Sequence, residues 1–185
     1  MDEPTTPQNG HWKRHAILFL ASQNISLFGS MLVQYAILWH ITLTTQSGVM
    51  MTISILCGFI PTLIISPFAG VWADRFDRKA VIIIADALIA ITTLGMAVAF
   101  HLGLDELWQL FAVLAIRSFG TGVQTPAVSA LLPQIVPAEH LTRVNGIQGC
   151  VQSLVSILTP LLSVALYTFS PIEHIFGIDV LTAAL

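Results

Sequence analysis

Three charged residues lie inside apolar runs, where an ionic side chain needs a chemical reason. Asp86 lies in the run 80–101, Arg117 in the run 108–131, and Asp179 in the run that starts near residue 175. A charge near the centre of a bilayer costs about 2.5 to 3.5 kcal/mol on insertion scales, so it faces a partner or a water-filled cavity. Two interpretations of Arg117 follow: an ion pair with Asp86 or Asp179, or a position that lines a polar cavity.

The apolar runs that carry these charges indicate an integral membrane protein. Of the 185 residues, 55% are hydrophobic and 9% are charged, against about 25% charged in an ordinary soluble domain. Five runs are long enough to cross a bilayer as helices: 16–42, 49–71, 80–101, 108–131 and 144–167. A sixth run stops at residue 185, where at about 1.5 Å per residue it covers about half of the hydrocarbon core. We expect an all-α membrane protein with a tail at 1–15 and a bundle at 16–185, made of five complete transmembrane helices and a truncated sixth.

Polar side chains recur along three of these runs at intervals of three or four residues. That spacing places them on one face of each helix, and polar groups that faced lipid would lack partners. Hydrogen bonding between helices and a polar cavity both explain such faces. Three polar faces together predict a common polar interior. The candidate cavity residues are Ser22, Gln23, Ser26, Ser30, Gln34, Arg117, Thr121, Gln124, Gln152 and Ser156.

The charged stretch 70–79 joins the second and third runs and predicts a tight polar turn at one membrane surface. If the chain starts inside the cell, six of its seven Lys and Arg residues fall on cytoplasmic segments: Lys13, Arg14, Arg75, Arg78, Lys79 and Arg143. Cytoplasmic loops carry an excess of positive charge. We therefore expect a multi-pass protein of the cell membrane with a cytoplasmic N-terminus, and an expected loop at 133–143 lies on the same side.

Several other chemistries have no sequence support. The chain has no phosphate-binding Gly-x-x-x-x-Gly-Lys-[Ser/Thr] loop and none of the common zinc, thiol or serine-hydrolase motifs. Its six histidines are dispersed, which argues against a metal site. Basic residues are too few for nucleic-acid binding. We expect no cofactor, no metal and no enzymatic activity.

The charged stretch also carries a family resemblance. Its Gly-x-x-x-Asp-Arg-x-x-Arg-Lys pattern, formed by Gly70, Asp74, Arg75, Arg78 and Lys79, resembles the loop signature of the major facilitator superfamily. Segments 12–14, 74–79, 84–86, 116–118, 125–127 and 178–181 resemble the macrolide-efflux branch, which includes enterobactin-exporter-like proteins. Asp77 replaces the loop's second usual glycine, as it does in that branch.

The resemblance implies a fold of two six-helix halves, each built from inverted three-helix repeats, with alternating access by rocking of the halves. This chain would be the N-terminal six-helix half. In the family the charged loop closes against the other half, so Asp74 would make gating contacts, while Arg75, Arg78 and Lys79 would hold the loop and lipid headgroups. The alternative is that these basic residues only set the topology. The implied partners are a small amphipathic substrate, membrane lipid and the missing C-terminal half.

The function that this resemblance implies is efflux of an amphipathic drug, such as a macrolide, by proton antiport. Arginine does not deprotonate, so the proton carrier would be Asp86, Asp179 or an acid of the other half. Export of a siderophore or other metabolite is the alternative within the superfamily. A membrane fragment without transport activity is the alternative outside it.

Overall fold

The computed structural model describes residues 11–104 and 106–183, without the side chains of His11, His15, Ala73, Asp74 and Glu173. All regular structure in this part of the chain is α-helical. The six helices are α1 (His11–Thr45), α2 (Gly48–Arg75), α3 (Arg78–His101), α4 (Leu107–Ile135), α5 (Ala138–Phe169) and α6 (Ile172–Ala183).

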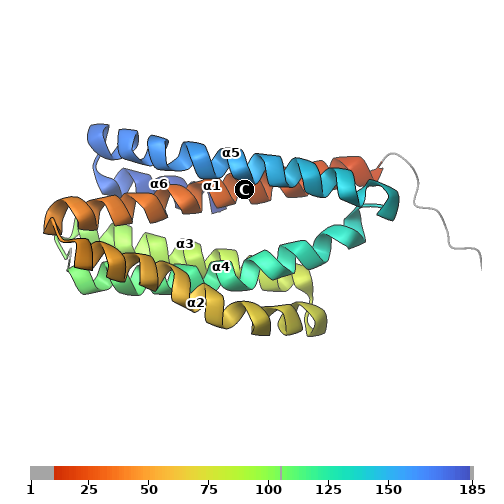
Figure 1. Cartoon of the computed structure of the whole chain (residues 1–185), viewed down its shortest axis with the longest axis horizontal. Helices are drawn as coiled ribbons and strands as arrows, with labels where there is room; N and C mark the ends of the chain where they lie inside the picture. Colours follow the sequence, from red (N-terminus) through yellow and green to blue (C-terminus); the bar gives the residue numbers. More distant parts are fainter. Residues whose placement is uncertain (1–10, 105, 184–185) are drawn as a thin grey trace, which may run out of the picture.

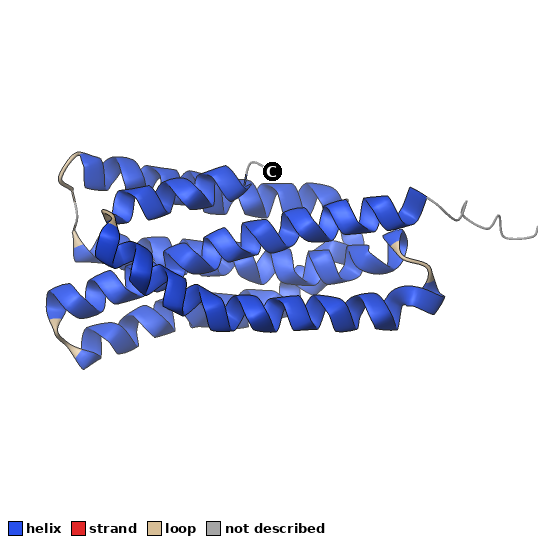
Figure 2. Ribbon diagram, turned by 90° about the horizontal axis from the view of Figure 1, so that it is seen from above, coloured by secondary structure: helices blue, strands red, loops and turns tan. Residues whose placement is uncertain are grey.

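The helices form an elongated bundle of two groups of three. Helices α1, α5 and α6 lie together on one side, and α2, α3 and α4 lie together on the other (Figure 1). Helix α1 packs on both α5 and α6, while α4 packs on both α2 and α3. Contacts between α3 and α6 join the two groups. The short connections gather at the two ends of the bundle, as Figure 2 shows from above.

Four of the described helices, α1, α2, α3 and α5, are long and apolar enough to cross a membrane. Helix α4 has 29 residues, but Arg117 and several polar side chains interrupt its apolar sequence. Eleven residues of α4 are buried, so it meets protein rather than lipid along much of its length. The outer surface is apolar, with side chains such as Ile91 and Phe169 exposed by 69% and 86%. Exposed apolar surface on this scale is typical of contact with lipid.

Six basic residues share one end of the bundle, at the right in Figure 1. They lie at the start of α1, the end of α2, the start of α3 and the first turns of α5: Lys13, Arg14, Arg75, Arg78, Lys79 and Arg143. Two contacts close this end. Trp12 stacks on His140 of α5 with ring centroids 5.1 Å apart, and Arg78 donates to the Ala130 carbonyl of α4 at 3.0 Å.

The expected loop at 133–143 is wrong. Helix α4 continues through Pro133 to Ile135, and α5 begins at Ala138. Proline has no backbone N–H and so removes one hydrogen bond from a helix. Pro133 stands in the last turn of α4, where few backbone hydrogen bonds of the helix remain to be formed. Pro137 takes the position just before α5, and its fixed φ suits a helix start.

The expected turn at 70–79 is shorter than predicted. Residues through Arg75 belong to α2, and α3 begins at Arg78, so only Phe76 and Asp77 lie between the helices. Asp77 is the N-cap of α3, and its carboxylate accepts from the Lys79 backbone N–H at 2.9 Å. A capping carboxylate satisfies a helix donor that would otherwise lack a partner, which gives a physical reason for aspartate in place of glycine.

Candidate functional site

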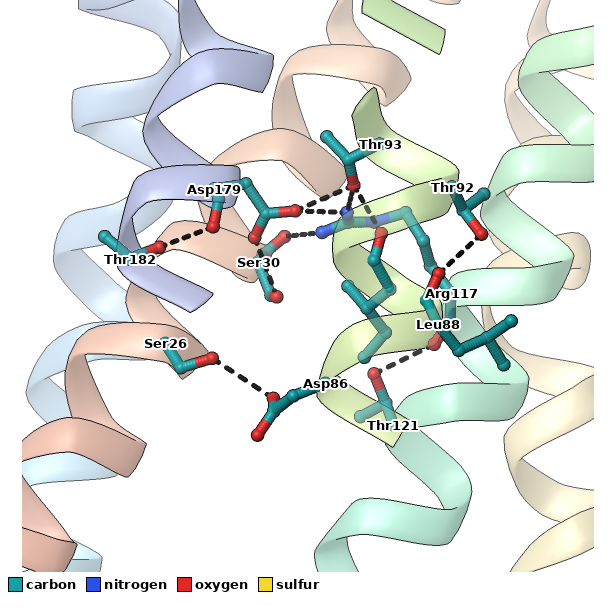
Figure 3. Close-up of polar contacts among 11 residues, drawn as sticks. Ser26, Ser30, Asp86, Leu88, Thr92, Thr93, Arg117, Thr121, Asp179 and Thr182 are labelled. Atoms are coloured by element: carbon teal, nitrogen blue, oxygen red, sulfur yellow. Dashed lines mark hydrogen bonds and ion pairs between the residues drawn. The ribbon is translucent and has the colours of Figure 1, made fainter. Parts of the chain in front are cut away.

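The Arg117 side chain of α4 is paired with Asp179 of α6 in the interior of the bundle (Figure 3). Arg117 Nη1 lies 2.5 Å from Asp179 Oδ2, and the two side chains are 6% and 1% exposed. Of the two carboxylates that the sequence offers, Asp179 is therefore the partner. The cost of burying the arginine is offset by a close opposite charge.

Two further helices complete this charged centre. Ser30 of α1 donates to Asp179 Oδ1 at 2.9 Å, and its carbonyl accepts from Arg117 Nη2 at 2.9 Å. The Thr93 hydroxyl of α3 accepts from Arg117 and lies 2.8 Å from Asp179 Oδ2. Both carboxylate oxygens of Asp179 thus have partners, and four helices meet at one ion pair. Thr93 was not predicted as a site residue; its only signal in the sequence was its place two helical turns after Asp86.

A glycine allows α6 to approach α1 at this centre. A Cβ at Gly29 would overlap the side chain of Thr182 and would lie 3.3 Å from the Asp179 Cα. Small residues permit such close approach of membrane helices. Gly29 precedes Ser30 directly, so close contact and hydrogen bonding occur at the same level of the bundle.

Asp86 forms a second polar centre between α1, α3 and α4. Its Oδ1 accepts from Gln124 at 2.7 Å and from Ser26 at 3.3 Å, and Gln124 also donates to Gln23 at 3.2 Å. Asp86 is half-buried. The Gln23 side chain also interacts with this carboxylate, and the three described partners of Asp86 are all neutral.

Helix α4 also holds α2, through the residue that follows Arg117. The Ser118 hydroxyl accepts from the Thr62 backbone N–H at 3.2 Å and donates to the Gly58 carbonyl at 2.8 Å. In a regular α-helix these two backbone groups pair with each other. Insertion of a side chain into the ladder is a known cause of helix bending, and Pro61 stands beside it in α2. The packing is tight here, since a Cβ at Gly122 would lie 3.0 Å from the Thr62 Cα.

Helix α5 contributes less to the interior than its polar pattern predicts. Gln148 exchanges hydrogen bonds with Asn24 of α1 at 2.9 and 3.3 Å, and Ser163 donates to the Leu32 carbonyl at 3.1 Å. Gln152 and Ser156 are exposed, and the Ser156 hydroxyl donates to the Gln152 carbonyl. Because α5 meets the bundle mainly through α1, most of its circumference is uncovered. The expected single polar interior is therefore two smaller centres, at Asp179 and Asp86.

The remaining candidate cavity residues divide into local and open positions. Ser22 donates to the Phe19 carbonyl and Thr121 to the Arg117 carbonyl, each within its own helix. Gln34 is exposed and lines a pocket of about 340 Å³ between α1, α2 and α4. The walls of this pocket are largely apolar and aromatic, and include Tyr35, Gly58 and Phe59. The role of these residues in a transport cavity stays a prediction.

The candidate gating residues lie at the basic end. The Asp74 side chain lies outside the described residues. Gly70 is within α2, and the space where its Cβ would stand is open, while Arg75 and Lys79 are exposed. Arg78 is anchored on α4, as described above. Within the described residues no group of three His, Cys, Asp or Glu could hold a metal ion.

Comparisons with known proteins agree with this architecture. The family model of the Major Facilitator Superfamily matches residues 16–185. Macrolide efflux protein A of Streptococcus pyogenes is 37% identical over 176 residues, which are 95% of this chain and 43% of that protein. Macrolide efflux protein A of Enterococcus faecalis is 39% identical over 140 residues, which are 75% of this chain and 43% of that protein.

A less similar relative is named for the transport of a different compound. The staphyloferrin A transporter of Staphylococcus aureus is 22% identical over 118 residues, which are 63% of this chain and 30% of that protein. The chain spans less than half the length of all three of these relatives. The family match covers more than nine tenths of the chain, and the helices make it a multi-pass membrane protein. The chain belongs to the major facilitator superfamily, as the N-terminal half of its fold.

Proposed function

We propose that this chain is the N-terminal half of a secondary-active efflux transporter that exports an amphipathic drug, such as a macrolide, in exchange for protons. The observation that carries the proposal is the 37% identity to a macrolide efflux protein over 95% of the chain. The transporter works by alternating access, with substrate bound between this bundle and a C-terminal half.

Three features of the bundle support such a role. The pocket between α1 and α2 combines aromatic walls with the Gln34 amide, a composition that suits an amphipathic organic molecule. The hydroxyl of Ser118 in the α2 ladder gives that helix a point at which to bend. Six basic residues gather at one end of the bundle, and we propose that this end faces the cytoplasm, where Asp74, Arg75 and Lys79 would contact the other half and anionic lipid.

Drug accumulation in whole cells tests this proposal. The protein, with its C-terminal half on the same or a second polypeptide, is produced in a macrolide-sensitive bacterium and uptake of radiolabelled erythromycin is followed. We expect lower accumulation than in cells with an empty vector, and a rise to the vector level when a protonophore collapses the proton gradient. An Arg117→Ala variant, matched for membrane abundance, should accumulate more drug. Equal accumulation in all strains, with or without the protonophore, would contradict the proposal.

Export of an iron-chelating siderophore is the second candidate, supported by the identity to the staphyloferrin A transporter. The same strains separate the two functions. Accumulation of the macrolide at the vector level, together with secretion of an iron-chelating siderophore above the vector level, would favour siderophore export.

A further inference from the structure

The charges inside the bundle do not balance. Among the described residues, the charged side chains in the middle of the helices are Asp86 on α3, Arg117 on α4 and Asp179 on α6. Arg117 and Asp179 neutralise each other at 2.5 Å. Asp86 is left with one uncompensated negative charge. Because charge inside a membrane is costly, the half-buried carboxylate favours a state in which a cation or a proton offsets it.

The two carboxylates also differ in the charge of their partners. Asp179 uses Oδ1 for Ser30 and Oδ2 for Arg117 and Thr93, and it is 1% exposed. The described partners of Asp86 are Ser26, Gln23 and Gln124, and all three are neutral. A proton can therefore bind Asp86 without the loss of an ion pair, whereas Asp179 is held in one.

We propose that Asp86 is the group of this bundle that binds and releases the exchanged proton, while Asp179 stays paired with Arg117. The inference rests on the proton antiport proposed above. A proton from water on one side of the membrane forms an O–H bond with a carboxylate oxygen of Asp86, and the carboxylate becomes a neutral carboxyl group. On the opposite side the O–H bond breaks, the electron pair returns to the carboxylate, and the proton leaves to water. No oxidant, reductant or further reactant is needed.

The neighbours of Asp86 suit a proton better than a metal ion. From α1 they are Ser26 and Gln23, and from α4 Gln124, all without charge. The Ser26 hydroxyl and the Gln124 amide donate to Asp86, and Gln23 accepts from Gln124. A sodium ion needs several oxygen lone pairs directed at it, whereas these groups direct hydrogens at the carboxylate. The titratable group on α6 is Asp179, and the charge on α4 is Arg117, which is already paired with it.

Infrared difference spectroscopy tests the assignment without measuring transport. The protein, with its C-terminal half present, is placed in lipid nanodiscs and its spectrum is recorded at stepped pH values. We expect a C=O stretch of a protonated carboxyl group that grows as the pH falls. This band should be absent in Asp86→Asn, shifted in frequency in Asp86→Glu, and unchanged in Glu139→Gln, whose carboxylate is exposed at the basic end. Circular dichroism of each variant checks that the helices are retained.

Two spectroscopic results would overturn the assignment. One is a pH-dependent band in Asp86→Asn that equals the band of the unaltered protein. The other is carboxylate bands of Asp86 that respond to added sodium chloride, against choline chloride as the control, but not to pH.

Transport in proteoliposomes separates this inference from the proposed function. With the unaltered protein, an imposed pH gradient should drive macrolide accumulation against its concentration gradient. Asp86→Asn should lose this accumulation but keep the exchange of labelled for unlabelled macrolide at equal concentrations. Accumulation that survives in Asp86→Asn contradicts the role of Asp86 while antiport stands. Absence of any pH-driven accumulation in the unaltered protein contradicts the antiport, whatever the infrared result.

Discussion

The centres around Asp179 and Asp86 share two helices but are completed differently. Asp179 lies on α6 between α1 and α4, while Asp86 lies on α3 between the same two helices. Asp179 is paired with an arginine, whereas the partners of Asp86 are serine and amide groups only.

Because their partners differ, Asp179 is suited to a permanent charge and Asp86 to a charge that is exchanged. The Asp179 centre ties four helices together and leaves neither carboxylate oxygen free. Its charge is compensated inside the protein by Arg117. The Asp86 centre joins its helices through neutral donors, so a gain or loss of charge there does not break an ion pair.

Arg117→Ala should have the largest effect on stability, because it leaves Asp179 buried and unpaired. Removal of one partner of a buried ion pair costs about 3 to 5 kcal/mol. We expect a large drop in the midpoint of thermal unfolding, measured in detergent by circular dichroism. Adding Asp179→Asn to Arg117→Ala should recover part of the loss, since the uncompensated charge disappears. A double variant less stable than Arg117→Ala alone would show that the unpaired charge of Asp179 is not the cause of the loss.

Ser118→Ala should have an intermediate effect. The exchange removes the hydroxyl that accepts from Thr62 and donates to Gly58, and an unsatisfied buried backbone group costs about 1 to 3 kcal/mol. Ser118→Thr keeps the hydroxyl and is the control. A Ser118→Ala protein with the unfolding midpoint of the unaltered chain would show that α2 closes its own ladder without α4.

Gly29→Ala should destabilise the Asp179 centre by a similar or smaller amount. The added Cβ overlaps Thr182, and overpacking costs about 1 to 3 kcal/mol. Gly95→Ala is the matched control, because nothing stands within 4 Å of its Cβ position in α3 and alanine favours a helix. The unfolding midpoint should fall for Gly29→Ala and stay or rise for Gly95→Ala. Equal shifts would mean that α6 is free to move away from α1.

Asp86→Asn should have the smallest effect on stability. The amide oxygen can still accept from Ser26 and Gln124, and the substitution removes an uncompensated charge, so the expected change is within about 1 kcal/mol. The same unfolding measurement checks this expectation. A loss as large as that of Arg117→Ala would show that Asp86 has an ionic partner and that the two centres are alike.

The sequence predicted where the helices lie and which buried charges need a partner or a cavity, but it did not predict the contacts between helices. Hydrophobic runs with flanking charges identified the spans, because lipid imposes length and polarity on them. The runs located helix ends poorly, since α4 and α5 extend beyond the apolar region and Pro133 is tolerated near a helix end. Arg117 was predicted either to pair with an acid or to line a polar cavity, and its pairing with Asp179 rather than Asp86 depends on how α6 packs.

Neutral residues in the site gave little signal in the sequence. Thr93 and Gly29 are common residues in membrane helices, and their roles follow only from which helix stands opposite. The role of Ser118 could not be predicted either, because its hydroxyl forms hydrogen bonds with the backbone of another helix. Gln152 and Ser156 are exposed on α5, and their place in a transport cavity stays a prediction, because a regular polar spacing does not say what covers that face of a helix.

Proton release on drug binding is the most direct test of whether Asp86 carries the exchanged proton. Macrolide is added to the purified protein, with its C-terminal half present, in weakly buffered detergent solution at several pH values, and a pH-indicator dye reports the protons set free. We expect release from the unaltered protein and from Glu139→Gln, and none from Asp86→Asn with the macrolide still bound. Equal release from Asp86→Asn and the unaltered protein would contradict the assignment of the exchanged proton to Asp86.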